Sequence, residues 1–176
     1  MHSTESLFIH GSGAAGFLKP YHGNNYSFAA ILPDEDIAIH DFVASLSGDS
    51  FIELMNSAQP ARVMTAMPKF NYEYEILMND ALKALGMPDA FSEAAADLSL
   101  MGNAGGNLFI SIVKHKAVIT VDERGTKAGA ATMVGGSVTS VPSYDHTVIL
   151  NRPFVYAIID NTTKLPIFMG ALLSVK

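Results

Sequence analysis

Cysteine is absent from the 176-residue chain, so a disulfide framework and a thiolate metal site are both excluded. Charged residues make up only 16% of the chain, and the formal net charge is -6, without a block of like charges. This acidic balance argues against nucleic-acid binding, which depends on a basic surface. No run of 18 apolar residues occurs, so we expect no membrane-spanning segment.

The first five residues lack a basic region followed by an apolar stretch, so we expect no signal peptide there. They also lack the start signal of a helix or a strand, and we expect the chain to begin in the middle of a domain. Apolar residues make up 49% of the chain, which is typical of a globular protein and too high for a disordered one. The composition therefore predicts one folded domain with a hydrophobic core.

Hydrophobic periodicity and turn residues divide the chain into short elements. Asp36 and Asp49 are candidate helix N-caps, and Gly86 lies where a left-handed C-cap is expected. The last two strands are almost entirely apolar, so we expect both of their faces to be buried. The predicted strands are 6–10, 16–21, 26–32, 61–74, 108–122, 154–159 and 167–173, and the predicted helices are 37–46, 50–58 and 78–85.

The segment 125–142 does not fit this pattern, because it is long, almost uncharged and built mostly from small residues. Loops of this length inside a compact domain are usually functional. If the segment were a strand, one face would carry small side chains only: Thr126, Ala128, Ala130 and Thr132. Such a strand could slide between two existing strands at little steric cost. Composition alone leaves two interpretations open, a segment that alternates between exposed loop and inserted strand, and a flexible surface loop.

No enzyme motif is present. The chain contains no Gly-x-Ser-x-Gly elbow, no metal cluster and no paired acids, so we expect neither enzymatic activity nor a metal or cofactor. The histidines are scattered, and no pair has the spacing of zinc ligands. The tripeptide at 144–146 is interpreted as a solvated loop rather than as half of a catalytic dyad.

Several stretches, in this order along the chain, resemble segments of the serpin family. The stretch 115–132 (HKAVITVDERGTKAGAAT) is similar to the strand and hinge that lead into the serpin reactive loop. The others resemble the central hairpin of the family, the strand before its ninth helix and its closing signature: 16–21, 26–33, 67–70, 151–156 and 166–170. Each motif is moderately specific, whereas the ordered set, which spans essentially the whole chain, is highly specific.

The resemblance implies an α+β fold, the C-terminal half of the serpin fold, with mostly antiparallel sheets, about three short helices and an exposed reactive loop. Residues 1–176 are expected to form a partial serpin domain whose amino-terminal half is absent, with the hinge and reactive loop at 123–142. The implied function is that of a serine protease inhibitor and suicide substrate, whose loop is cleaved and then inserts into the sheet, trapping the acyl-enzyme. The implied hinge residues are Glu123, Gly125, Thr126, Ala128, Gly129, Ala130, Ala131 and Thr132.

Counting along the hinge, as is usual in the family, places the reactive bond between Thr139 and Ser140. Counting back from 151–153 places it nearer the bond between Pro142 and Ser143. The first count is preferred, because the length of the inserted segment fixes where the protease ends up. Val138 and Thr139 are small and uncharged, which implies an elastase-like protease as the partner and argues against a trypsin-like one.

In serpins the histidine that matches His115 lies in a hydrogen-bond cluster that controls sheet opening, so we expect a switch there; the alternative is a satisfied polar core residue. Most family members are secreted, which implies an extracellular location. The strand 108–122 would lack a neighbour, and its open edge favours self-association. A second functional hypothesis is a truncated, non-inhibitory fragment that acts as a protease substrate or binding module.

Overall fold

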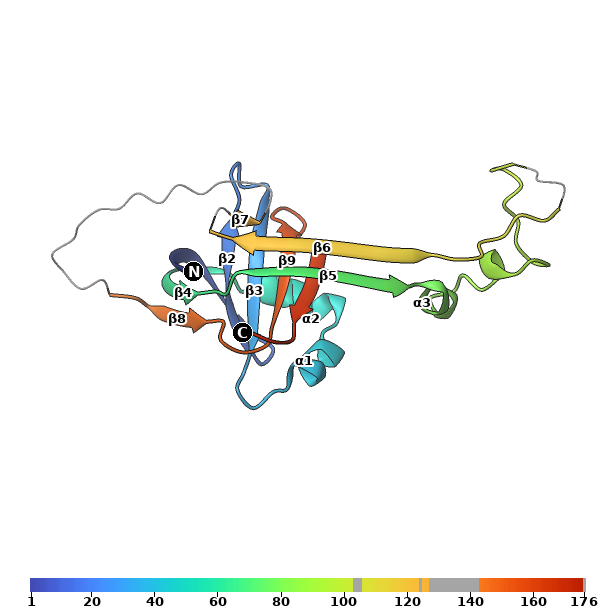
Figure 1. Cartoon of the computed structure of the whole chain (residues 1–176). Coiled ribbons are helices and arrows are strands. Elements are labelled where there is room, and N and C mark those ends of the chain that lie inside the picture. Colours follow the sequence, from blue (N-terminus) through green and yellow to red (C-terminus); the bar gives the residue numbers. More distant parts are fainter. Residues whose placement is uncertain (103–105, 124, 127–142, 176) are drawn as a thin grey trace. The chain divides into compact units, whose positions relative to one another are not determined.

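The computed structural model describes residues 1–102, 106–123, 125–126 and 143–175 (Figure 1). The chain forms two compact units, the first from residues 1–70 and 121–176 and the second from residues 71–120. Within the described residues, strands predominate and three short α-helices occur. The predicted α+β class is therefore confirmed. Across the described part of the chain, no helix is long and apolar enough to cross a membrane.

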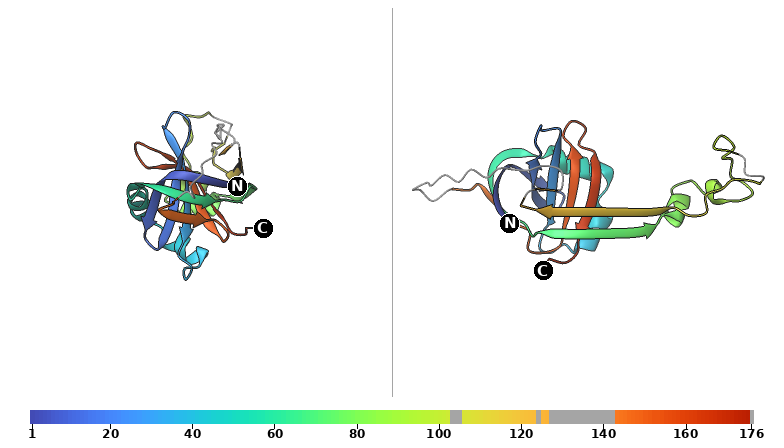
Figure 2. Two further views of the ribbon diagram at one scale, coloured as in Figure 1. Left: turned by 90° about the vertical axis from the view of Figure 1, so that its left-hand side faces the viewer. Right: turned by 45° about the horizontal axis from the view of Figure 1, so that its top comes forward.

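The first unit is built on a seven-stranded sheet with the strand order β10-β9-β3-β2-β1-β4-β8. Neighbouring strands pair antiparallel, except β4 and β8, which run parallel. Segments that are distant in sequence therefore lie side by side, and Figure 2 shows the blue strands of the early chain beside the orange and red strands of its end. The strands are β1 (His2–Gly11), β2 (Ala14–Pro20), β3 (Tyr26–Pro33), β4 (Gln59–Ala66), β8 (His146–Ile149), β9 (Phe154–Asp160) and β10 (Pro166–Leu172).

The predicted strands 16–21 and 26–32 are confirmed, and they form the hairpin of β2 and β3. Its turn contains Gly23 and Asn24, both with positive φ (87° and 57°), the conformation that glycine and asparagine adopt most readily. The start of β1 was predicted wrongly, because the strand begins at His2 rather than near residue 6. Residues 2–5 pair with residues 63–66 of β4, and a partner so far along the chain leaves no local signal.

Two short helices follow the hairpin, α1 (Ile39–Ser45) and α2 (Gly48–Asn56), but their predicted caps were wrong. The side chain of Ser47 accepts a hydrogen bond from the Ser50 amide at 3.1 Å, and the Ser50 hydroxyl accepts one from the Ser47 amide at 2.9 Å, which forms a capping box. The N-cap of α1, Ala38, makes no side-chain cap bond. Asp36 therefore does not cap α1, and Asp49 lies in the first turn of α2, where the helix dipole favours a negative charge.

Both helices bury an apolar face against the sheet. Phe42 of α1 and Leu54 of α2 are each only 1% exposed, which places them in the core. The core joins the two helices to β1, β2, β3 and β9, so the last segments of the chain are built into the same cluster as the first. Its buried members are Ile9, Ala14, Leu18, Ala29, Ile31, Phe42, Phe51, Leu54, Met55, Val155, Ala157 and Ile159.

The closing strands β9 and β10 differ in burial. Most of β9 is buried, because it lies between β3 and β10. The expectation of two buried faces was wrong for β10, where Ile167 is 61% exposed and Met169 is 42% exposed. The reason is its position, because β10 lies at the end of the described sheet.

The second unit contains most of β5 (Phe70–Leu77) and β6 (Lys114–Asp122), which run side by side. Two ion pairs link them, Lys114 to Glu75 at 2.7 Å and Lys116 to Glu73 at 2.6 Å. One face of the pair is therefore charged, because Lys114 and Lys116, two residues apart, lie on the same face of β6. The predicted strand 61–74 is instead two strands, β4 and β5, which belong to different sheets and are separated around Pro68, a residue that disfavours a continuous strand.

The unit also contains α3 (Asn79–Ala84) and a single 3-10 turn, η1 (Asp89–Phe91). The predicted C-cap is confirmed, because Gly86 has a φ of +101° and the amide of Met87 donates to the Leu82 carbonyl at 3.1 Å, as in a Schellman motif. The strand predicted at 108–122 begins only at Lys114. Before that point the backbone bonds to other partners, for example the Val113 amide to Asn79 Oδ1 at 2.8 Å.

Candidate functional site

The end of β6 leads into the segment that stands out in the sequence. Residues 118–121 are all β-branched, which favours an extended strand, and Val121 is only 2% exposed. After Glu123 the chain reverses, and β7 (Gly125–Thr126) pairs antiparallel with the end of β6, so that Val121 faces Thr126. The chain therefore leaves β6 through a short reversal rather than by continuing straight on.

An ion pair marks this reversal. The carboxylate of Glu123 accepts a hydrogen bond from Nζ of Lys69, and both side chains are more than half exposed. This bond from Lys69, together with one from the Glu123 backbone amide, lowers the pKa of the Glu123 carboxyl below its ordinary value. Exposed ion pairs contribute little to overall stability. The ion pair instead fixes the position of Glu123, because it links the residue after β6 to the residue before β5.

Lys69 is itself held in place by its neighbour in sequence. The ring of Phe70 lies 6.0 Å from that of Phe154 and 5.2 Å from that of Tyr156, measured between centroids. Phe154 and Tyr156 are 0% and 2% exposed, so the aromatic contact fixes the backbone at Lys69 against the core of the first unit. The ion pair thus connects Glu123 to a rigid part of the fold.

The structure describes three of the predicted hinge residues. Glu123 lies in the ion pair, and the backbone of Gly125 and Thr126 forms β7. The rest of the predicted site lies outside the described residues: Ala128, Gly129, Ala130, Ala131 and Thr132 of the hinge, and Thr139 and Ser140 of the reactive bond. Their assignment remains a prediction.

His115, the predicted switch, lies in β6 and is exposed. Among the residues that the structure describes, none forms a hydrogen bond or ion pair with its side chain. Within the same part of the chain, no group of three His, Asp or Glu residues could hold a metal ion.

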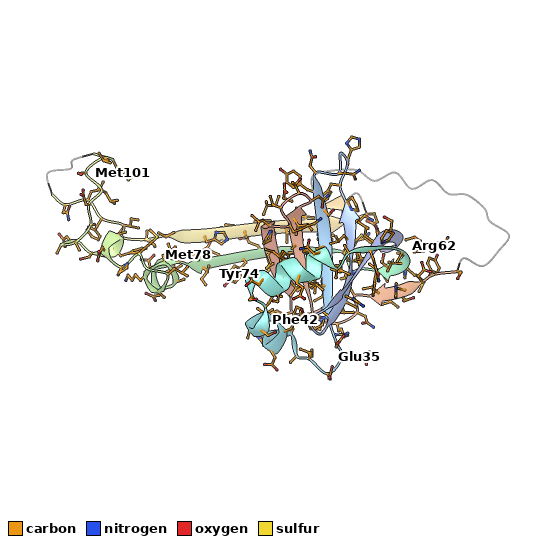
Figure 3. The ribbon with its side chains drawn as sticks, turned by 180° about the vertical axis from the view of Figure 1, so that it is seen from behind. Glu35, Phe42, Arg62, Tyr74, Met78 and Met101 are labelled. Carbon is orange, nitrogen blue, oxygen red and sulfur yellow. The ribbon has the colours of Figure 1, made fainter. Side chains whose placement is uncertain are left out.

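Sequence reasoning missed the site at which the segment rejoins the sheet. Residues 144–146, interpreted as a solvated loop, lead directly into β8, whose first residue is His146. Asp145 Oδ2 accepts a hydrogen bond from the Arg62 amide at 2.7 Å, and the Arg62 guanidinium lies 5.1 Å from the centre of the Tyr144 ring. Figure 3 labels Arg62 close to β8. The only signal in the sequence was the short run Thr147-Val148-Ile149, which is β-branched but too brief to distinguish from a loop.

Comparison with known proteins gives a consistent result. The model of the family described as serpin (serine protease inhibitor) matches residues 3–175. The crystal structure of tengpin, a thermophilic serpin, in its native state superposes with a TM-score of 0.87 at 50% sequence identity, covering 99% of this chain and 46% of that one. An intracellular coagulation inhibitor of Tachypleus tridentatus is 35% identical over 156 residues, and human serpin B13 is 31% identical over 171 residues.

The coverage is uneven between this chain and its relatives. The alignment spans 87% of this chain but 37% of the Tachypleus inhibitor, and 96% of this chain but 43% of human serpin B13. The chain thus spans less than half the length of these relatives. Because the match runs through residues 3–175 and the fold agrees at 50% identity, the chain belongs to the serpin family.

Proposed function

We propose that the full-length protein that contains this chain inhibits a serine protease by offering residues 123–142 as a bait. The observation that carries the proposal is the Lys69–Glu123 ion pair at the reversal after β6, which fixes the start of a long segment of small residues. In the second unit, no described strand lies on the side of β6 away from β5 along 114–120. The backbone groups of that edge could pair with an inserted strand.

The proposed reaction begins as ordinary proteolysis. The protease serine oxygen bonds to the carbonyl carbon of Thr139, the bond to the Ser140 nitrogen breaks, and the new amine takes a proton from the protease's general acid. An ester then joins Thr139 to the protease. The freed segment inserts beside β6 as a strand and carries the protease with it, and the distorted protease fails to hydrolyse the ester.

Hinge composition supports insertion. The residues that would face the sheet interior are small, and the one cationic side chain of 125–142, Lys127, falls on the opposite face of an extended strand, where its charge can stay in water. On the inner face, a bulky residue would clash with the sheet, and a charged residue would be buried at a cost in free energy. Proline there would remove a backbone donor from the new ladder.

The proposed target is an elastase-like protease, because Val138 and Thr139 suit a small specificity pocket. We place the inhibitor outside the cell, although the Tachypleus relative is named an intracellular inhibitor. Fractionation of the producing cells tests the location. Recovery in the medium supports it, and retention in the cytosol contradicts it.

We also propose that the protein associates with itself through an open sheet edge. A solved structure that is 46% identical over this whole chain is that of a loop C-sheet serpin polymer, and an unpaired strand edge is a template for a second chain. Light scattering during gel filtration tests this point. Oligomers that grow with concentration support it, and a monomer at all concentrations contradicts it.

The inhibitor proposal is tested by mixing the full-length protein with pancreatic elastase and separating the products on a denaturing gel. A covalent band at the summed mass, with the ester mapped to Thr139, supports the mechanism. Clean cleavage near Thr139 with full elastase activity contradicts it and favours the second candidate, a protease substrate. Two variants sharpen the test: Thr139→Arg should transfer the covalent band from elastase to trypsin, and Ala130→Pro should turn the inhibitor into a substrate while cleavage continues.

A further inference from the structure

Strand β8 is attached to the sheet by a short ladder. Its partner is β4, and the four registered pairs run from Val63 with His146 to Ala66 with Ile149. The pairing is parallel, which is slightly weaker per residue than antiparallel pairing. In the described sheet β8 is also an end strand, with a neighbour on one side only. Backbone pairing alone therefore gives this strand little resistance to local opening.

The two ends of β8 are held in different ways. Towards the C-terminal end, Val148 is 3% exposed and Leu150 is 2% exposed, and the Leu150 amide donates to the Ala66 carbonyl at 2.8 Å. Burial of apolar side chains thus anchors that end, since removing them from the core would return their surface to water. The strand should consequently open from its N-terminal end.

At the N-terminal end the contacts are polar. Arg62 and Asp145 exchange two hydrogen bonds, from the Arg62 amide to Asp145 Oδ2 at 2.7 Å and from the Asp145 amide to the Arg62 carbonyl at 2.9 Å. The Arg62 guanidinium also lies over the Tyr144 ring, 5.1 Å from its centre. Arg62 therefore holds both residues that precede the strand, Asp145 through its backbone and Tyr144 through its side chain.

One further contact reaches past β4 to the next strand. The ring of His146 stacks on that of Phe8 in β1, with centroids 3.8 Å apart and planes 6° from parallel. Phe8 is only 6% exposed, so its ring is a fixed platform, and it also meets His10 edge-on at 5.8 Å. The stack couples the first residue of β8 to the interior of the sheet.

We propose that Arg62, Tyr144, Asp145 and His146 form a clasp that decides how often β8 peels away from β4. Arg62 and Asp145 are exposed, and Tyr144 and His146 are half-buried, so water competes for each contact and none is strong by itself. Together they close the weak end of a strand whose other end is anchored by burial. When the clasp opens, residues 63–66 of β4 lose their partner and become a free edge. The clasp stands on described residues and does not depend on the proposed inhibition.

The test is hydrogen–deuterium exchange of the full-length protein, read for peptides that cover 143–150 and 59–66. Asp145→Ala removes a charge-assisted hydrogen bond, and exchange in both peptides should rise about tenfold. Asp145→Asn keeps an acceptor for the Arg62 amide without the charge, and the rise should be smaller. Arg62→Ala removes the cation–π contact while leaving the backbone bonds, and exchange should rise about threefold.

The stack is tested separately at His146. His146→Ala should raise exchange in the same two peptides, whereas His146→Phe should restore protection, because a phenyl ring can lie on Phe8 in the same way. Lys83→Ala serves as the matched control, since it removes the other described cation–π contact, with Phe91 at 5.5 Å. The control should leave both peptides unchanged.

Two results would overturn the proposal. Unchanged exchange at 143–150 in Asp145→Ala and Arg62→Ala would show that burial alone holds the strand. An equal rise in the peptide that covers β9 would show that the variants loosen the whole sheet rather than β8. Because no protease is present in this experiment, its outcome is independent of whether the protein inhibits one.

Discussion

Replacing Gly16 with alanine should break the sheet at a defined place. A Cβ at this position would lie 1.9 Å from the carbonyl oxygen of Ala30 on the neighbouring strand, 3.0 Å from its carbonyl carbon and 3.2 Å from Cδ1 of Ile9. Carbon and carbonyl oxygen normally come no closer than about 3.3 Å, so β2 and β3 would have to separate by more than about 1 Å. Backbone atoms cannot rotate away as a flexible side chain can.

The cost follows from this geometry. Separating the strands lengthens the hydrogen bonds of the β2–β3 ladder and disturbs the core beneath them, so we expect Gly16→Ala to lower the free energy of unfolding by about 3 kcal/mol. Urea titration followed by circular dichroism measures the change. Gly48→Ala is the control, because a Cβ there meets nothing within 4 Å and alanine favours a helix over glycine by about 0.5 kcal/mol. A loss below about 1 kcal/mol in Gly16→Ala would refute the steric argument.

Three further predictions concern the caps, the core and the hinge. Ser47→Ala removes the acceptor for the Ser50 amide and should lower the free energy of unfolding by about 1 kcal/mol. An unchanged melting curve would show that the capping box does not stabilise the protein. Leu54→Ala, at a position that is 1% exposed, should cost about 3 kcal/mol in urea unfolding, and a cost below that of Ser47→Ala would contradict the core assignment. The hydrogen bond from Lys69 lowers the pKa of Glu123. The stability that Glu123→Gln removes should therefore be fully present well above pH 4.5 and fade as the pH falls through the lowered pKa. A stability difference between the two proteins that grows on acidification would contradict this prediction.

Local patterns predicted the parts of the fold that depend on neighbours in sequence. The β2–β3 hairpin follows from two apolar runs around a turn of glycine and asparagine, and the end of α3 follows from Gly86. The caps failed because aspartate and serine compete for the same role, and only the backbone path decides which one lies at the helix start. Here that residue was Ser47 rather than Asp49.

Contacts between segments that are distant in the sequence could not be predicted from local patterns. The first residues of β1 are a strand only because β4 lies beside them, and β8 likewise pairs with β4, far away in sequence. The same limit applies to the candidate site. The segment 123–142 stood out by its composition, and Glu123 was assigned to the hinge. No residue near Glu123 in the sequence indicates that Lys69 is its partner.

The position of β9 has a consequence for biosynthesis. This strand lies between β3 and β10 in the sheet, yet the ribosome makes it long after β3 has left the exit tunnel. Until residues 154–160 are translated, the edge of β3 has no partner there, and the core that contains Ala29 and Ile31 lacks Val155, Ala157 and Ile159. The sheet therefore has to close late, from sequence-distant pairs, which slows folding and leaves a period in which the nascent chain needs protection from aggregation.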